Sequence, residues 1–187
     1  MQRELVEQAQ EGDVDAFTQL MRLSAPRLTS VAYLILNDTE RAKDAVQDAL
    51  VKAWRDMGAL RDPDAWDAWI RRLTVNICLQ VARRDKRRTV LERQAAPAPS
   101  AMSIDDATVD VTEREWILSE LNRIDIDQRS VLVLHYYLDL PMREVAETIG
   151  IPMGTASSRL HRGLEALRAS MNSTPVTTVE TSTEQSS

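Results

Sequence analysis

Residues 140–168 contain two amphipathic helical patterns separated by only a short turn. In the first pattern, Val145 and Ile149 recur at helical spacing, and Gly150 follows where a helix commonly ends in a left-handed residue. The second pattern begins after Pro152, a residue that interrupts a continuing helix. Two helices joined by so short a turn must pack against each other. The sequence therefore predicts a helix-turn-helix motif near its C-terminal end.

The rest of the chain also favours helices. Its long periodic segments are rich in alanine, leucine, arginine and glutamate, whereas glycine is scarce at five residues and alternating strand patterns are almost absent. With 43% hydrophobic residues, the 187-residue chain can bury a core. We therefore predict an all-α fold class, with two small helical domains joined by a flexible linker.

A break in the helical pattern separates the two domains. Residues 94–110 contain two prolines, small residues and three aspartates but no apolar stripe, which is typical of a flexible linker. This places an N-terminal domain at residues 1–93 and a C-terminal domain, with the helix-turn-helix, at residues 111–171. Residues 172–187 are rich in serine and threonine, and their composition predicts a disordered tail.

Helix-end signals divide the domains further. The helices expected in the N-terminal domain span residues 2–10, 13–36 with a break or kink at Pro26, 39–57 and 63–88. Asp62 can cap the fourth of these, and Pro63 suits its first position. In the C-terminal domain, a helix over residues 111–123 precedes one that Asp127 can cap, and Pro141 can open the first helix of the helix-turn-helix.

Charge is unevenly distributed along the chain. The net charge is −6, but residues 71–93 contain eight basic residues against only Asp85 and Glu92, a local charge of +6. Because attraction to phosphate depends on local positive patches, the acidic total does not exclude a nucleic-acid partner. The start of the last helix also carries hydroxyl and guanidinium groups, where a recognition helix meets the major groove of DNA. These candidates are Thr155, Ser157, Ser158, Arg159 and Arg162.

Two features of the N-terminal domain leave alternatives open. The helix over residues 39–57 has one apolar stripe, which predicts core, and one polar face, which spacing alone favours as solvated surface. That face includes Asp44, Gln47, Asp48, Lys52 and Arg55. Trp66 and Trp69 begin the next helix at a spacing of three, which favours burial, although either ring could stack on a base.

Several other protein classes are disfavoured. Cys78 is the only cysteine and cannot form an internal disulfide, and neither a signal peptide nor an apolar run of about 18 residues is found. The sequence lacks a glycine-rich phosphate loop, a nucleophile motif and a Glu-x-x-His motif, so we expect no catalysis, no cofactor and no metal. A stand-alone helix-turn-helix regulator is the remaining alternative.

Four segments occur in a fixed order and together cover most of residues 10–170. They are GDVDAFTQL, DAVQDALVKAW, WIRRLTVNICLQVARRDKRR and the stretch that begins IDQRSVLVLHYYL. In this order they resemble the extracytoplasmic-function (ECF) sigma factors of bacterial RNA polymerase. The resemblance implies an alternative sigma factor that binds core RNA polymerase, directs promoter recognition and transcription initiation, and is not an enzyme. It also implies an anti-sigma factor as a plausible partner. The single cysteine, Cys78, fits a location in the reducing cytoplasm.

The resemblance assigns roles to the candidate residues. The helix with DAVQDALVKAW would dock on the clamp helices of the largest polymerase subunit, through Asp44, Gln47, Asp48, Lys52 and Arg55. The following segment would bind the minus-ten promoter element, through Trp66, Trp69, Arg71, Arg72, Asn76, Arg83, Arg84, Arg87 and Arg88. The helix-turn-helix would bind the minus-thirty-five element. Relatives commonly carry a branched apolar residue and a lysine where this chain has Ala156 and Ser157, which suggests an altered sequence preference.

Overall fold

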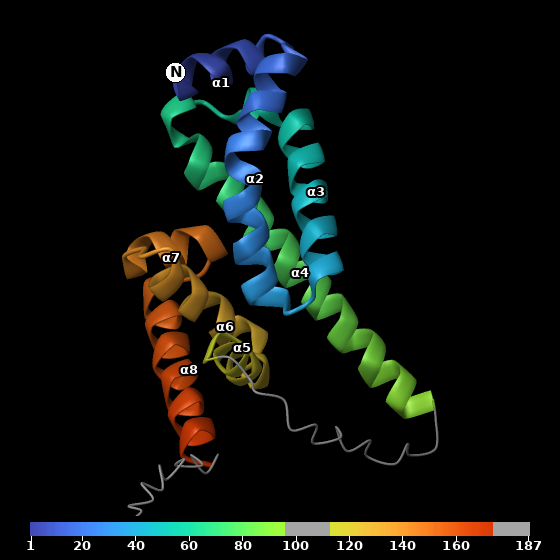
Figure 1. The fold of residues 1–187 in the computed structure, drawn as a ribbon, viewed down its shortest axis with the longest axis vertical. Coiled ribbons are helices and arrows are strands. Elements are labelled where there is room, and N and C mark those ends of the chain that lie inside the picture. Colours follow the sequence, from blue (N-terminus) through green and yellow to red (C-terminus); the bar gives the residue numbers. More distant parts are fainter. Residues whose placement is uncertain (96–112, 174–187) are drawn as a thin grey trace, which may run out of the picture.

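The computed structural model describes residues 1–95 and 113–173, which form helices and the turns between them. The N-terminal part contains α1 (Gln2–Gln10), α2 (Val14–Leu36), α3 (Thr39–Arg55), the 3-10 turns η1 (Met57–Ala59) and η2 (Pro63–Ala65), and α4 (Trp66–Ala95). The C-terminal part contains α5 (Glu113–Arg123), α6 (Ile126–Leu132), the π-helical turn η3 (Val133–Tyr137), α7 (Met142–Ile149) and α8 (Met153–Ser173). Figure 1 shows α1 to α4 as one bundle, with α5 to α8 beside it. The predicted all-α fold class is confirmed.

Most of the predicted helix-end signals are confirmed. The Asp62 carboxylate accepts a hydrogen bond from the backbone N–H of Asp64, as predicted, but the turn that it caps is η2, and α4 begins only at Trp66. At the start of α2, the carboxylate of Asp13 accepts hydrogen bonds from two backbone N–H groups. Gly150 ends α7 with a φ of 77°, in the left-handed region that glycine adopts without strain. The helix α2 continues through Pro26. The proposed linker lies almost entirely outside the described residues, as does the proposed tail.

The cap predicted for α6 is wrong. Asp125, rather than Asp127, is the capping residue, and its carboxylate accepts a hydrogen bond 3.0 Å long from the backbone N–H of Asp127. The backbone is extended at Asp125, with a ψ of 139°, and this conformation turns the carboxylate toward the first turn of the helix. The carboxylate of Asp127 is therefore free to bind side chains from other helices.

The N-terminal core forms where α2, α3 and α4 pack together. The apolar stripe predicted for α3 is confirmed, because its alanines, together with Val46 and Leu50, are buried. The periodicity of α3 also places Trp54 in this stripe, but its side chain is 37% exposed at the stripe's edge, where its ring centroid lies 4.9 Å from that of Phe17. Cys78 is buried in α4, as its apolar surroundings in the sequence predict.

The helix-turn-helix rests on α6. The periodicity of α8 predicts that Ala156 and the leucines that follow it at helical spacing face inward. Ala156 is buried, and these leucines are half-buried. Helices α8 and α6 approach closely at Gly163 of α8, where a Cβ atom would lie 2.9 Å from the Cδ1 atom of Leu132 in α6. This close packing fixes the axis of α8 relative to α6, and so fixes where the exposed start of α8 lies.

Candidate polymerase and nucleic-acid interface

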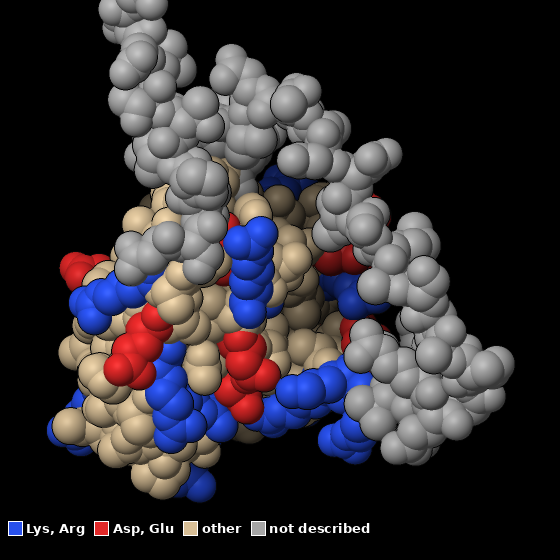
Figure 2. Space-filling model, turned by 90° about the horizontal axis from the view of Figure 1, so that it is seen from below, with Lys and Arg blue, Asp and Glu red and all other residues tan. Residues whose placement is uncertain are grey.

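Acidic and basic side chains lie next to each other at the lower end of the molecule. Figure 2 shows this end with blue and red atoms interspersed over the visible face. Part of the basic run of α4 is neutralised by acidic residues from elsewhere in the fold. Arg83 pairs with Asp127, and Lys86 pairs with Asp125. The local positive charge predicted from the sequence is therefore only partly available to a partner.

The residues with an expected polymerase role share one exposed face of α3. Asp44, Gln47 and Asp48 are exposed, and none of them makes a side-chain hydrogen bond or an ion pair with the described residues. Lys52 pairs with Asp56 one turn later, at 3.2 Å. An exposed surface pair of this kind adds little stability. The face thus offers carboxylate and amide groups that the fold itself does not use.

Two grooves flank this polar face. The groove between α2 and α3 has a volume of about 620 Å³, and its lining includes Phe17, Gln47, Val51 and Trp54. A second groove, between α3 and α4, has a volume of about 550 Å³ and is more polar. Its lining includes Asp48, Lys52, Arg55 and Arg84. The sequence did not predict the apolar groove, although Val51 on an otherwise polar helix face was a signal for it.

The two tryptophans at the start of α4 have different surroundings. Trp66 is fully buried, and its indole Nε1 donates a hydrogen bond to the Ser24 hydroxyl at 3.0 Å. The assignment of Trp66 to DNA is therefore wrong, because a fully buried ring cannot stack on a base. Trp69 is half-buried, and its ring centroid lies 5.8 Å from that of Trp66.

The predicted minus-ten residues are not equally accessible. Arg72, Arg84 and Arg87 are exposed and have no hydrogen-bond or ion-pair partner among the described residues, and Asn76 is half-buried on α4. The side chain of Arg88 lies outside the described part of the structure. The accessible residues of this set are therefore spaced discontinuously along α4.

Arg71 is held inside the protein. Its side chain is 15% exposed and lies 3.7 Å from Glu144 of α7, and its Nε is buried without a hydrogen-bond partner among the described residues. Burial lowers the pKa of the Arg71 guanidinium, the Glu144 carboxylate opposes this shift, and Arg27 adds to it. Arg71 therefore bridges the two domains in this arrangement and is not free to meet DNA.

The predicted minus-thirty-five residues cluster in the first turns of α8. Ser157 and Arg162 are exposed and make no side-chain hydrogen bond with the described residues. Thr155 and Ser158 are half-buried, and the Ser158 hydroxyl donates back to the carbonyl of Thr155 at 3.0 Å. Arg159 is only 20% exposed because its guanidinium binds Asp127 at 3.3 Å. Arg162 is thus the most accessible arginine of the set.

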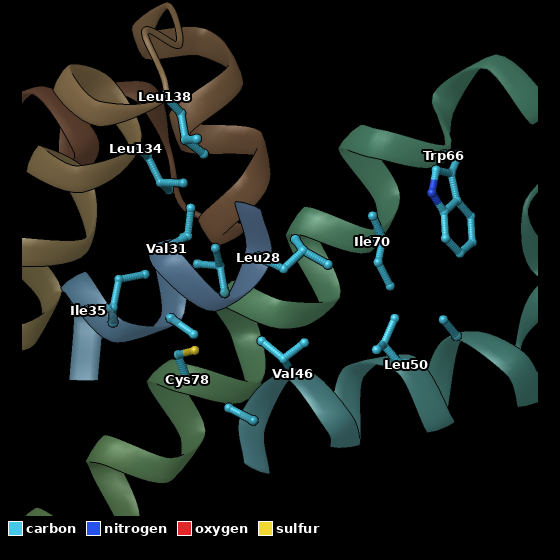
Figure 3. Close-up of a cluster of buried hydrophobic side chains, with 14 of the residues drawn as sticks. Leu28, Val31, Ile35, Val46, Leu50, Trp66, Ile70, Cys78, Leu134 and Leu138 are labelled. Atoms are coloured by element: carbon cyan, nitrogen blue, oxygen red, sulfur yellow. The ribbon is translucent and has the colours of Figure 1, made fainter. Parts of the chain in front are cut away.

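The N-terminal and C-terminal domains pack directly on each other. Figure 3 shows Val31 and Ile35 of α2 facing Leu134 and Leu138 of the C-terminal domain, and all four side chains are buried. Next to them, the guanidinium of the buried Arg129 donates to the backbone carbonyl of Ile35 at 2.9 Å. We refer to this packed arrangement as the closed form. The sequence predicted two domains but gave no sign of this contact.

Two sequence families match the chain, one in each domain. The family described as Sigma-70 region 2 matches residues 20–89, and the family described as Sigma-70, region 4 matches residues 114–167. The first match runs from α2 into α4, and the second runs from α5 into α8. Within the described residues, there is no helix of sufficient length and apolar character to cross a membrane, and no cluster of metal-binding side chains.

Individual relatives match over nearly the whole chain. The ECF RNA polymerase sigma factor SigM of Mycobacterium tuberculosis is 32% identical over 151 residues, which cover 81% of this chain and 74% of SigM. The RNA polymerase sigma-E factor of Streptomyces avermitilis is 30% identical, with 87% of this chain and 88% of the relative covered. SigW of Bacillus subtilis is 25% identical over 90% of this chain and 95% of its own length.

Two solved structures share the fold. CnrH, in complex with the cytosolic domain of CnrY, matches with a TM-score of 0.64 and covers 93% of this chain and 99% of its own. The sigma factor RpoE from Bartonella quintana, in complex with the anti-sigma factor NepR, matches with a TM-score of 0.65 over 87% of this chain and 100% of its own. Both are 24% identical to this chain. The ordered match of both domains excludes a stand-alone helix-turn-helix regulator, and the chain belongs to the extracytoplasmic-function sigma factors of RNA polymerase, a family of initiation factors rather than enzymes.

Proposed function

We propose that this chain binds core RNA polymerase through α3 and directs it to a two-part promoter. In this proposal the N-terminal domain, residues 1–93, also binds the minus-ten element, and the C-terminal domain, residues 111–171, binds the minus-thirty-five element. The observation that carries the proposal is the exposed polar face of α3, whose carboxylates have no partner among the described residues. Because the chain belongs to the sigma factors, core RNA polymerase is the partner that we expect for this face.

The chemistry of α3 suits a helical partner with basic groups. Asp44 and Asp48 lie one turn apart on the same side, so both carboxylates can meet one basic helix of the polymerase clamp. Beside them, Val51 and Trp54 line the apolar groove between α2 and α3. Apolar anchors next to charged groups are a common composition of protein interfaces. We therefore assign the apolar groove to the same polymerase contact.

The start of α8 suits duplex DNA. The exposed guanidinium of Arg162 can form paired hydrogen bonds with a guanine edge or with phosphate, and the exposed hydroxyl of Ser157 can bond a phosphate oxygen. A serine at this position makes a shorter and uncharged contact than a lysine. We expect sequence preference to come mainly from Arg162, with Arg159 contributing once it leaves Asp127.

The surface of α4 suits opened DNA. Strand separation exposes bases that can enter a protein pocket or stack on an aromatic ring. Trp69 is half-buried, and Asn76 has both donors and acceptors to offer a base edge. Arg72 and Arg84 are exposed and can bind the backbone. Binding free energy, rather than bond chemistry, would stabilise the opened strand.

We also propose an anti-sigma factor as a partner and the cytoplasm as the location. The RpoE structure was solved with the anti-sigma factor NepR, and the CnrH structure was solved with the cytosolic domain of CnrY. Core RNA polymerase works in the bacterial cytoplasm, so a factor that binds it must work there too. The reaction itself needs no catalytic group from this chain.

A titration of core polymerase tests the docking assignment. The double change Asp44→Ala and Asp48→Ala should weaken core binding by roughly tenfold, because two charges leave the interface while helicity is kept. The matched control is Glu4→Ala with Glu11→Ala, which removes the same charge from exposed positions in and beside α1. Equal affinities for the two double variants would contradict the assignment of α3.

A further inference from the structure

One carboxylate in the closed form binds two arginines from different domains. The Oδ1 atom of Asp127 accepts from Arg83 of α4 at 3.0 Å, and its Oδ2 atom accepts from Arg159 of α8 at 3.3 Å. Arg83 is assigned above to the minus-ten element and Arg159 to the minus-thirty-five element. The first turn of α6 thus holds a basic group from each DNA-binding surface at the same time.

A second carboxylate extends this contact. Asp125, two residues earlier, binds Lys86 of α4 at 3.3 Å. Burial alone would raise the pKa of Asp125, but hydrogen bonds from the Asp127 N–H and from Lys86 bring this pKa below its usual range, so the carboxylate is charged at neutral pH. Carboxylate and phosphate oxygens accept the same charge-assisted hydrogen bonds from arginine and lysine. Asp125 and Asp127 therefore occupy cationic groups that DNA phosphates would otherwise bind.

The closed form cannot span a two-part promoter. Elements centred at minus ten and minus thirty-five are separated by roughly 85 Å of duplex, at about 3.4 Å per base pair. Arg83 and Arg159 share a carboxylate, and Val31 and Ile35 are buried against the C-terminal domain, so no such span is possible in this arrangement. The domains must separate before both elements can be bound together.

We infer that Asp125 and Asp127 form an autoinhibitory latch, which stands in for DNA phosphate and holds the free sigma factor in the closed form until core polymerase binds. This inference rests on the proposed function. The main packing partners of α3 are α2 and α4, and the polar face of α3 stays exposed in the closed form, so polymerase can dock before the latch opens. The latch can be reversible because the Arg83 side chain is 47% exposed and its ion pair is weakened by solvent.

The variant Asp127→Asn tests the latch without altering any residue assigned to DNA or polymerase. It keeps the size of the side chain but removes the charge that binds Arg83 and Arg159. The matched control is Asp139→Asn, which makes the same change of charge in the same domain at an exposed carboxylate with no ion pair to the described residues. Asparagine also tolerates the positive φ of 54° at that position.

Two measurements on the full chain, both made without polymerase, test the latch. Dyes attached through Ala59→Cys and Met171→Cys report domain separation by energy transfer, and both positions are exposed. The native Cys78 needs no replacement, because burial raises the pKa of its thiol to about 12 and hides it from the dye. The second measurement is the affinity of the chain for a short double-stranded DNA.

The latch predicts a coupled result. Asp127→Asn should lower energy transfer and tighten DNA binding by roughly two- to fivefold relative to Asp139→Asn, and core polymerase should reduce this difference. Equal behaviour of the two variants, or weaker DNA binding by Asp127→Asn, would overturn the latch. A failure of the proposed function is distinguishable, because it would appear as absent transcription with core polymerase whatever the energy transfer shows.

Discussion

Arg129 of α6 and Ile35 of α2 are joined by a buried hydrogen bond, 2.9 Å long, from the guanidinium Nη1 to the backbone carbonyl. The same guanidinium donates to the carbonyl of Asn122 in the last turn of α5 and to that of Ile124 in the turn between α5 and α6. Burial lowers the pKa of Arg129, and its Nε has no partner among the described residues. One side chain thus ties the local fold of the C-terminal domain to its contact with α2.

Replacing Arg129 should destabilise the protein. The variant Arg129→Met keeps much of the apolar stem but leaves buried carbonyl groups without donors, so the free energy of unfolding should fall by about 2–3 kcal/mol. Urea denaturation followed by circular dichroism measures this difference. Arg143→Met serves as the control, because Arg143 is 84% exposed and Glu147 is its only ion-pair partner among the described residues. Its effect should stay within about 0.5 kcal/mol, and similar losses in both variants would contradict the role given to Arg129.

The two glycines of α8 should respond in opposite directions to alanine. Gly163→Ala places a methyl group 2.9 Å from Leu132, a buried side chain with little room to move, so the free energy of unfolding should fall by about 1–2 kcal/mol. Gly154→Ala meets no atom within 4 Å and improves helix propensity, so stability should rise by up to about 1 kcal/mol. Thermal denaturation of the two variants measures both changes in stability. A stable Gly163→Ala variant would show that α8 packs less closely on α6.

The tryptophans at the start of α4 should separate into structural and functional roles. Trp66→Phe removes a buried indole and its hydrogen bond to Ser24, so it should lower stability by about 1–2 kcal/mol. Trp69→Phe should leave stability nearly unchanged but reduce promoter opening, which permanganate reactivity of unpaired thymines measures. Unchanged thymine reactivity in Trp69→Phe would remove Trp69 from the minus-ten contacts.

The pH dependence of stability should reveal the charge of Asp125. Its pKa is lower in the folded protein than its ordinary value of 3.8, so the folded state favours the charged form. The stabilisation is present above that ordinary pKa and is lost as pH falls through the lower folded pKa. Asp125→Asn keeps a capping side chain but has no charge. The stability difference between wild type and this variant, measured by urea denaturation, should be present near neutral pH and shrink by about pH 3. A difference that does not change with pH would mean that capping, rather than charge, is the contribution of Asp125.

Local features of this fold could be predicted because they depend on nearby residues. The left-handed end of α7 at Gly150 and the cap at Asp13 follow from residue type and spacing. The exposed side of α8 follows from periodicity in the same way. The sequence places Asp125 and Asp127 two residues apart at the start of α6. Only the backbone conformation shows that Asp125 caps the helix and that Asp127 lies in its first turn.

The contact between the domains could not be predicted from the sequence. Helical periodicity predicts that Val31 and Leu134 are core positions of their own helices, but it does not indicate that they face each other. The same limit applied to the charged residues. The sequence predicts that Arg71 and Arg83 are unpaired cations in a basic run, but long-range packing places carboxylates from the other domain beside them. The exposure of a charged side chain depends on tertiary neighbours that local patterns do not encode.

Run-off transcription with core RNA polymerase on a library of genomic fragments is the most direct test of promoter recognition by this chain. Transcripts should appear only when both the chain and core polymerase are present, and only from fragments that share two short motifs at a fixed spacing. The double variant Asp44→Ala and Asp48→Ala should reduce these transcripts. Selective DNA binding by the chain alone, with no polymerase-dependent transcript from any fragment, would mean that the chain does not direct core polymerase to promoters.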